Sequence, residues 1–147
     1  MIKTYVASPL GARYPEMVEA NRVACKLYID RIENFHHSLA PVALHHILPR
    51  VLDDSDPADR ELALEMGREV LKRCDALLIC GNVISKGMAK EIEQAMSKRL
   101  VIYYANESLL EAPEWSALGL DGYNGGCFLI PDPVLAAPSL VLGGFGE

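Results

Sequence analysis

The sequence predicts an α/β protein, a Rossmann-like (flavodoxin-like) parallel sheet of four to five strands with helices on both faces. Short β-branched or apolar runs alternate with longer segments of helical periodicity along the first 104 residues. Two of the runs, 76–80 and 100–104, are continuously apolar, which is typical of parallel strands buried on both faces. Alternation of this kind favours a parallel sheet joined by right-handed crossovers.

The first half of the chain contains two of the expected strands and one long helix. Residues 3–7 are rich in β-branched and aromatic side chains, and a Ser-Pro-Leu-Gly turn ends them. From Pro15, which suits a first helical turn, apolar residues recur at helical spacing until about Phe35. Residues 39–43 form a short apolar run and predict the second strand.

The second half adds two helices to the apolar strands. Asp56 and Pro57 have the residue types of an N-cap and a first helical residue, and that helix is expected to run toward Arg73. A loop is expected over residues 81–87 and a further helix over 88–97.

The chain beyond residue 104 is less regular. We expect a short helix at 108–118 and one strand at 128–130, within a tail rich in glycine and proline. The whole chain, 1–147, is predicted to be a single domain, with 105–147 as a C-terminal extension that packs on the domain or on a partner subunit.

Composition limits the classes of protein that the chain can represent. Half of the 147 residues are hydrophobic, which excludes a disordered chain. The net charge of −6 disfavours binding to a nucleic acid polymer, because such affinity comes from clustered Lys and Arg. No apolar stretch is long enough for a membrane helix and no signal peptide is evident, so we expect a cytoplasmic location.

The four cysteines have neither CxxC pairing nor metal-ligand spacing, and three of them lie in apolar periodic segments, so we interpret them as reduced core residues. His45 and His46 follow a strand, but no third spaced ligand accompanies them, so no metal site and no cofactor is predicted. His45 instead is a candidate for the edge of a ligand site. His36 and His37 are expected to face solvent at a helix end, and Asp75 to cap its strand.

In open parallel sheets, ligands bind outside the carboxyl ends of the strands. This rule selects residues 8–14, 45–54 and 81–91. The last segment is a loop with Ser85 and Gly87 that opens a helix, where backbone amides can hold an anion. Glu91 follows about one turn later, and a carboxylate there can act on a sugar C1′. The alternative is a solvated glutamate that improves the electrostatics of the helix.

Three stretches of the sequence resemble the nucleoside 2-deoxyribosyltransferase-like superfamily over roughly residues 2–104. They are Tyr-Val-Ala-Ser-Pro at 5–9, Cys-Asp-Ala-Leu-Leu-Ile at 74–79, and Ser-Lys-Gly-Met-Ala-Lys-Glu-Ile-Glu-Gln-Ala at 85–95. The similarity is strongest to a poorly characterised bacterial and phage branch with an S-x-G-M-x-x-E-I signature. An A-P-x-x-x-H segment of that branch is similar to residues 40–45.

The resemblance implies roles for individual residues. Glu91 matches the family's nucleophilic glutamate, and Tyr5 matches the tyrosine that orients it, although an aromatic side chain in a buried strand is ordinarily a core residue. The residues that we expect to contact a ligand come from the loops at the strand ends and from the helix at 57–73: Ser8, Pro9, His45, Ser85, Gly87, Met88 and Arg68.

The sequence departs from the family pattern at one position. Transferases of the family place an aspartate, which assists the leaving base, on the helix before residue 75, and Gly67 stands at approximately that position here. The departure puts transfer between free nucleosides in doubt. The neighbouring Arg68 would favour a phosphorylated ligand if it faced the cleft.

The expected activity is cleavage or transfer at the N-glycosidic bond of a small-molecule nucleoside or nucleotide, with Glu91 as the nucleophile. The alternative from another class is a non-catalytic nucleotide-binding module, such as a sensor or a phage accessory protein. A purely structural subunit is a third possibility. The apolar tail at 128–145 would be costly to expose, so a homo-oligomer is also expected.

Overall fold

A computed structural model of the chain describes residues 1–9, 15–44, 52, 56–106, 123 and 125–136. Within these residues it has five strands and three helices, which alternate through the first four strands as the sequence predicts. In chain order they are β1 (Ile2–Ala7), α1 (Pro15–Phe35), β2 (Leu39–Val42), α2 (Pro57–Lys72), β3 (Ala76–Ile79), α3 (Lys86–Ser97), β4 (Val101–Tyr104) and β5 (Cys127–Leu129).

The five strands form one sheet in the order β2-β1-β3-β4-β5, and every neighbouring pair is parallel. The predicted α/β class and its Rossmann-like parallel sheet are therefore confirmed. Strand β1 is the second strand of the sheet and lies between β2 and β3, with Tyr5 opposite Val42 on one side and Leu77 on the other. Because the chain runs outward from β1 in both directions, the strand order reverses between β1 and β3.

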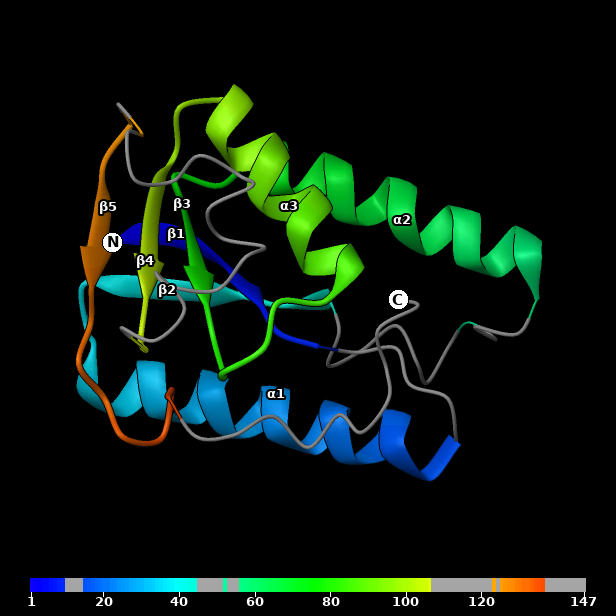
Figure 1. Cartoon of the computed structure of the whole chain (residues 1–147), viewed down its shortest axis with the longest axis horizontal. Coiled ribbons are helices and arrows are strands. Elements are labelled where there is room, and N and C mark those ends of the chain that lie inside the picture. The colour runs from blue at the N-terminus through cyan, green and yellow to red at the C-terminus, as the bar shows by residue number, and fades with distance from the viewer. Residues whose placement is uncertain (10–14, 45–51, 53–55, 107–122, 124, 137–147) are drawn as a thin grey trace.

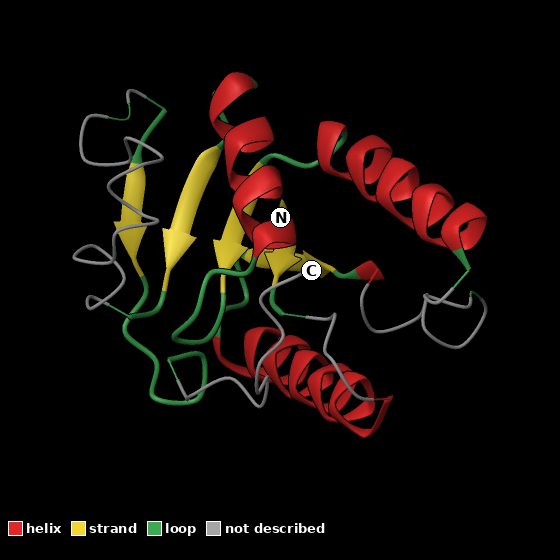
Figure 2. Cartoon of the chain, turned by 45° about the vertical axis from the view of Figure 1, so that its right-hand side comes forward, coloured by secondary structure: helices red, strands yellow, loops and turns green. Residues whose placement is uncertain are grey.

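Helices cover both faces of the sheet, since crossovers of one hand that run in opposite directions place their helices on opposite faces. Helix α1 lies on one face, and α2 and α3 lie together on the other (Figures 1 and 2). The two faces have separate buried cores. The α1 face includes Val6, Tyr28, Ile32, Leu78 and Cys80. The opposite face includes Tyr5, Leu71, Leu77, Ile79, Met88 and Ile92.

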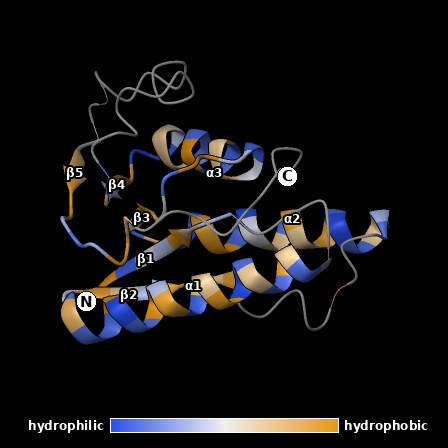
Figure 3. Ribbon diagram, turned by 60° about the horizontal axis from the view of Figure 1, so that its bottom comes forward, coloured by the Kyte–Doolittle hydropathy of each residue, from blue (hydrophilic) through white to orange (hydrophobic). Residues whose placement is uncertain are grey.

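Local chemistry explains where two of the helices begin. The side chain of Asp56 accepts a hydrogen bond of 2.9 Å from the Ala58 amide, and Pro57 is the first residue of α2, as predicted. Helix α3 begins at Lys86, two residues earlier than predicted, because the Ser85 hydroxyl oxygen accepts from the Met88 amide at 3.2 Å. Figure 3 shows hydrophobic and hydrophilic residues mixed along α1 and α2, as expected for helices with one face on a sheet.

The segment expected as an extension contributes to the sheet itself. Strand β5 (Cys127–Leu129) extends the sheet beside β4, one residue earlier than predicted. Leu135 is fully buried in the core of the α1 face, and its carbonyl accepts a hydrogen bond of 2.7 Å from the Gly81 amide. The helix predicted at 108–118 lies outside the described residues.

The expectation that His36 faces solvent is wrong. Its Nε2 lies 3.0 Å from an Asp132 carboxylate oxygen, and Arg31 pairs with the same carboxylate at 3.0 Å. The amides of Val134 and Leu135 also donate to Asp132. This Asp132 cluster fixes the turn after β5 to the end of α1, a long-range contact that no local pattern indicates. His37 is exposed, as expected.

Candidate active site at the ends of β1 and β3

The reversal of strand order between β1 and β3 marks the point where ligands bind in open α/β sheets. Two described segments lie there: Ser8 and Pro9 follow β1, and the loop at 80–85 follows β3 and leads into α3. The sequence had selected these loops from the order of the elements alone. The structure adds two groups to the same place, one from inside β1 and one from α2.

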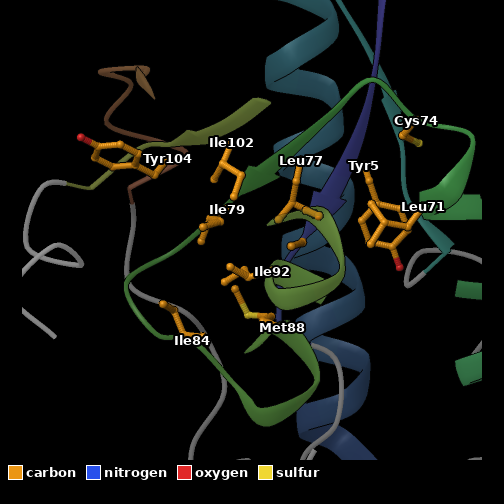
Figure 4. Close-up of a cluster of buried hydrophobic side chains, with 12 residues drawn as sticks. Tyr5, Leu71, Cys74, Leu77, Ile79, Ile84, Met88, Ile92, Ile102 and Tyr104 are labelled. Atoms are coloured by element: carbon orange, nitrogen blue, oxygen red, sulfur yellow. The ribbon is translucent and has the colours of Figure 1, made fainter. Parts of the chain in front are cut away.

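Tyr5 lies within β1 and is 1% exposed, so it is a core residue as well as a site residue. Figure 4 shows its ring beside Leu71 of α2, with the hydroxyl directed toward the edge of the hydrophobic cluster. Burial raises the pKa of this phenol well above its ordinary value, and the hydrogen-bonded carboxylate of Glu91 raises it further. Tyr5 is therefore protonated at neutral pH and can donate its hydrogen to Glu91.

Glu91 reaches Tyr5 from the first half of α3. The helix buries Met88, Ile92 and Ala95 against the sheet, and Glu91 borders that buried face. The residue is half-buried, with its Oε2 atom fully covered by protein. This placement disagrees with a glutamate that is simply solvated on the helix surface. The contact between Tyr5 and Glu91 joins two residues 86 positions apart in the sequence.

A second buried polar pair lies at the end of β1. Ser8 is 1% exposed, and its hydroxyl is near enough to the thiol of Cys25 in α1 to affect the pKa of that thiol. Burial raises the pKa of the Cys25 thiol; the Ser8 hydroxyl opposes that rise, and the Glu91 carboxylate adds to it. Cys25 is therefore a neutral thiol that supports the end of β1 from the α1 side. The sequence predicts Cys25 as a core residue but does not connect it to Glu91.

Gly67 brings α2 into the site. A Cβ atom at this position would lie 3.4 Å from the Tyr5 hydroxyl oxygen, so the helix presents its bare backbone to the tyrosine. The neighbouring Arg68 points elsewhere: its guanidinium is 53% exposed and lies 3.6 Å from Glu61. The Arg68 carbonyl accepts a hydrogen bond of 2.9 Å from Gln94, which ties α2 to α3. In this arrangement, Gly67 rather than Arg68 lies next to the Tyr5 hydroxyl.

The other residues that the sequence predicts as ligand contacts lie in different surroundings. Ser85 is buried at the N-terminus of α3, and its oxygen is used in capping the helix. Gly87 is half-buried in the first turn, whereas the Met88 side chain belongs to the core. Pro9 is buried beside Ser8. His45 lies outside the described residues.

Two asparagines at the carboxyl ends of β3 and β4 were not singled out from the sequence. The Asn106 side-chain amide donates a hydrogen bond to the side-chain oxygen of Asn82, which joins the two loops. Asp75, at the opposite end of β3, accepts from the Lys3 amide at 3.1 Å, which agrees with a structural role. The asparagine pair could be recognised only from the strand order, which makes β3 and β4 neighbours.

In the described part of the chain, no group of three or more His, Cys, Asp or Glu side chains is arranged to hold a metal ion. None of the helices described has the length and apolar character needed to cross a membrane. All four cysteines are free thiols, and three of them are buried, as predicted.

Residues 2–105 match the model of a family described as a domain of unknown function, DUF7768. The chain belongs to this family. No curated protein matches the chain. Among solved structures, the chain is similar to a conserved protein from Enterococcus faecalis V583, with 15% identity and a TM-score of 0.50 over 90% of this chain and 92% of that one. At that identity the likeness concerns the fold alone.

Proposed function

We propose that this member of the DUF7768 family cleaves or transfers the N-glycosidic bond of a small nucleoside or nucleotide. The observation that supports the proposal most directly is the hydrogen-bonded pair of Tyr5 and Glu91 at the point where the strand order reverses. A carboxylate held by a neutral donor beside a ligand-binding edge has the arrangement of an oriented nucleophile. The sequence resemblance to the nucleoside 2-deoxyribosyltransferase-like superfamily assigns the same roles to the same two residues.

The proposed reaction has two steps. A Glu91 oxygen attacks C1′ of the sugar, the bond between C1′ and the base nitrogen breaks, and its electron pair leaves with the base, which takes a proton from solvent. Water or a second base then attacks C1′ of the glycosyl ester and releases the Glu91 carboxylate, while the attacking group loses a proton to solvent. Water gives hydrolysis and a second base gives transfer.

Tyr5 acts on this reaction through Glu91. Its hydroxyl hydrogen fixes the direction of the carboxylate, and the raised pKa keeps that hydrogen in place throughout the neutral range. Ser8, Ser85 and the amide of Gly87 are the described groups that would hold the sugar or a phosphate at the same edge.

A non-catalytic nucleotide-binding module is the second candidate, and Gly67 favours it. Transferases of the superfamily that the sequence resembles have an aspartate for the leaving base at approximately this position, whereas here the position has no side chain and α2 presents its backbone to the Tyr5 hydroxyl. The same site could then bind a nucleotide without releasing its base.

A base-release assay separates the two candidates. Purified protein is incubated with ribo- and deoxyribonucleosides and their 5′-monophosphates, and free base is measured by chromatography for the wild type and for Glu91→Ala. The matched control is Glu93→Ala, an exposed glutamate on the same helix. Release that disappears in Glu91→Ala and persists in Glu93→Ala supports the enzyme.

The binding module predicts a different pattern. Calorimetry would then show binding of one of these compounds without base release, and binding would survive in Glu91→Ala. Base release that is equal in the wild type and in Glu91→Ala would contradict the nucleophilic role.

A further inference from the structure

We infer that the side of helix α2 that faces away from α3 is an interaction surface for a second copy of this chain, which binds through the same helix in the antiparallel direction. Five residues form this surface, here called the α2 stripe: Asp59, Leu62, Met66, Val70 and Arg73. The inference does not depend on the proposed function. It also concerns a different surface from the apolar tail at 128–145, from which a homo-oligomer is expected.

Helix α2 is poorly buried for a helix that packs on a sheet. The structure describes all 16 of its residues, and Leu71, near the C-terminal end, is the single buried one. Leu62 and Met66 are 46% and 38% exposed. Figures 1 and 2 show the N-terminal part of α2 extending past the strands and past α3. The helix therefore leaves neighbouring apolar side chains in contact with water, which is unfavourable unless a partner covers them.

Helical spacing places the α2 stripe on one side of the helix. Its members are separated by three, four, four and three positions, the separations that bring side chains to the same side. Leu64 and Arg68, two positions before and after Met66, lie on the other side. That other side is next to α3, because the Arg68 carbonyl accepts a hydrogen bond of 2.9 Å from Gln94. The stripe is therefore the side of α2 that α3 leaves open.

The order of residues along the stripe is self-complementary. Consider two copies of α2 that run antiparallel about a twofold axis at Met66. Leu62 of each copy then lies opposite Val70 of the other, and Asp59 lies opposite Arg73. Symmetry repeats each pair, so apolar side chains meet apolar ones on both sides of the axis and a carboxylate meets a guanidinium at both ends. The two Met66 side chains meet at the axis itself.

The charges also select the direction of pairing. Parallel copies would place Asp59 against Asp59 and Arg73 against Arg73, and like charges opposite one another are unfavourable. The contact area sets the expected strength. Two helices of 16 residues bury less than the roughly 800 Å² per partner of a standard interface, so we expect a reversible dimer in the micromolar range.

The first test changes the residue at the axis. Sedimentation velocity of the full chain across the micromolar range gives the dissociation constant of the dimer. Met66→Lys brings two ammonium groups together at the axis and should raise that constant at least about 100-fold. Leu64→Lys is the matched control, because Leu64 is 40% exposed on the same helix but lies on its other side. It should change the constant by less than about threefold.

The second test checks the register. Asp59→Lys should weaken the dimer about tenfold or more, and Asp59→Lys/Arg73→Asp should restore it, with helix content compared by circular dichroism. A crosslink provides a readout that does not depend on these charges. Met66→Cys, oxidised with diamide, should form a disulfide-linked dimer on a non-reducing gel, whereas Leu64→Cys and the wild type, with its four free thiols, should not.

Three outcomes would overturn the inference. The first is a wild-type chain that stays monomeric throughout the range; a Tm lower in Met66→Lys than in Leu64→Lys would then show that another segment of the same chain covers the stripe. The second is a dimer that both lysine variants weaken equally or leave unchanged, because its interface then lies elsewhere. The third is equal crosslinking of Met66→Cys and Leu64→Cys, which contradicts the predicted axis.

Discussion

Two carboxylates in different regions of the molecule, Asp132 and Glu91, show how differently this fold uses an acidic side chain. Asp132, in the turn after β5, is surrounded by donors: the side chains of Arg31 and His36 and two backbone amides. Glu91, at the start of α3, shares its surroundings with the neutral hydroxyl of Tyr5. The first carboxylate is compensated by charge, and the second is held by a neutral group.

The pKa values in the two regions also differ. Although burial opposes it, hydrogen bonds from His36, the two amides and Arg31 lower the pKa of Asp132 below its ordinary value. Glu91 instead raises the pKa of its neighbours Tyr5 and Cys25. The hydrogen bonds to Asp132 stabilise the fold, whereas the contact of Glu91 with the neutral Tyr5 hydroxyl is the one on which the proposed reaction depends.

The largest expected effect follows from removing the charge of Glu91. Glu91→Gln keeps the shape and an acceptor for Tyr5, but it removes the nucleophilic oxygen. Base release should fall at least about a thousandfold, as for other essential catalytic groups, while Tm stays the same or rises. Chromatography and thermal unfolding measure the two quantities. A large drop in Tm would place Glu91 with Asp132, as a structural carboxylate.

Tyr5→Phe should have the next largest effect. The variant keeps the ring in the core and removes the hydroxyl that orients Glu91, so kcat should fall by about 10- to 100-fold with a smaller change in KM. Tyr28→Phe is the matched control, since Tyr28 is equally buried but belongs to the α1 face. Equal activity in both variants would contradict the orienting role.

Asp132→Asn tests the structural role of the carboxylate after β5. The substitution leaves Arg31 and His36 without their carboxylate in a partly buried place, and we expect a loss of about 2 kcal/mol in the free energy of unfolding. Urea unfolding followed by circular dichroism measures it. Base release per folded molecule should be preserved, and its loss would show that the two regions are coupled.

The smallest expected effect is on the stability of the protein at acidic pH. Because the pKa of Asp132 is lowered in the folded protein, its contribution to stability is complete above the ordinary Asp pKa of about 3.9 and is lost as the pH falls through the lower folded value. Urea midpoints between roughly pH 5 and pH 2.5 should therefore fall more steeply for the wild type than for Asp132→Asn. Parallel pH profiles would contradict the assignment.

The two carboxylates also differ in how well the sequence predicts them. Glu91 and Ser85 stand at fixed spacing within one loop and helix, so local pattern and the rule for parallel sheets identified them together. Asp132 and His36 are 96 residues apart, and no short-range signal connects them. A histidine at a helix end is expected to face solvent. Only the sheet order shows that the turn after β5 lies beside α1.

The sequence by itself determined the α/β class, the alternation of strands and helices, and the loops at which a ligand site would form, because periodicity, caps and turns are encoded over a few residues. Only the tertiary structure decided that Tyr5 meets Glu91, that Gly67 faces the same hydroxyl, and that Ser8 lies near Cys25. These contacts join β1, α1, α2 and α3, and they depend on which strands are neighbours and on which face of the sheet each helix packs.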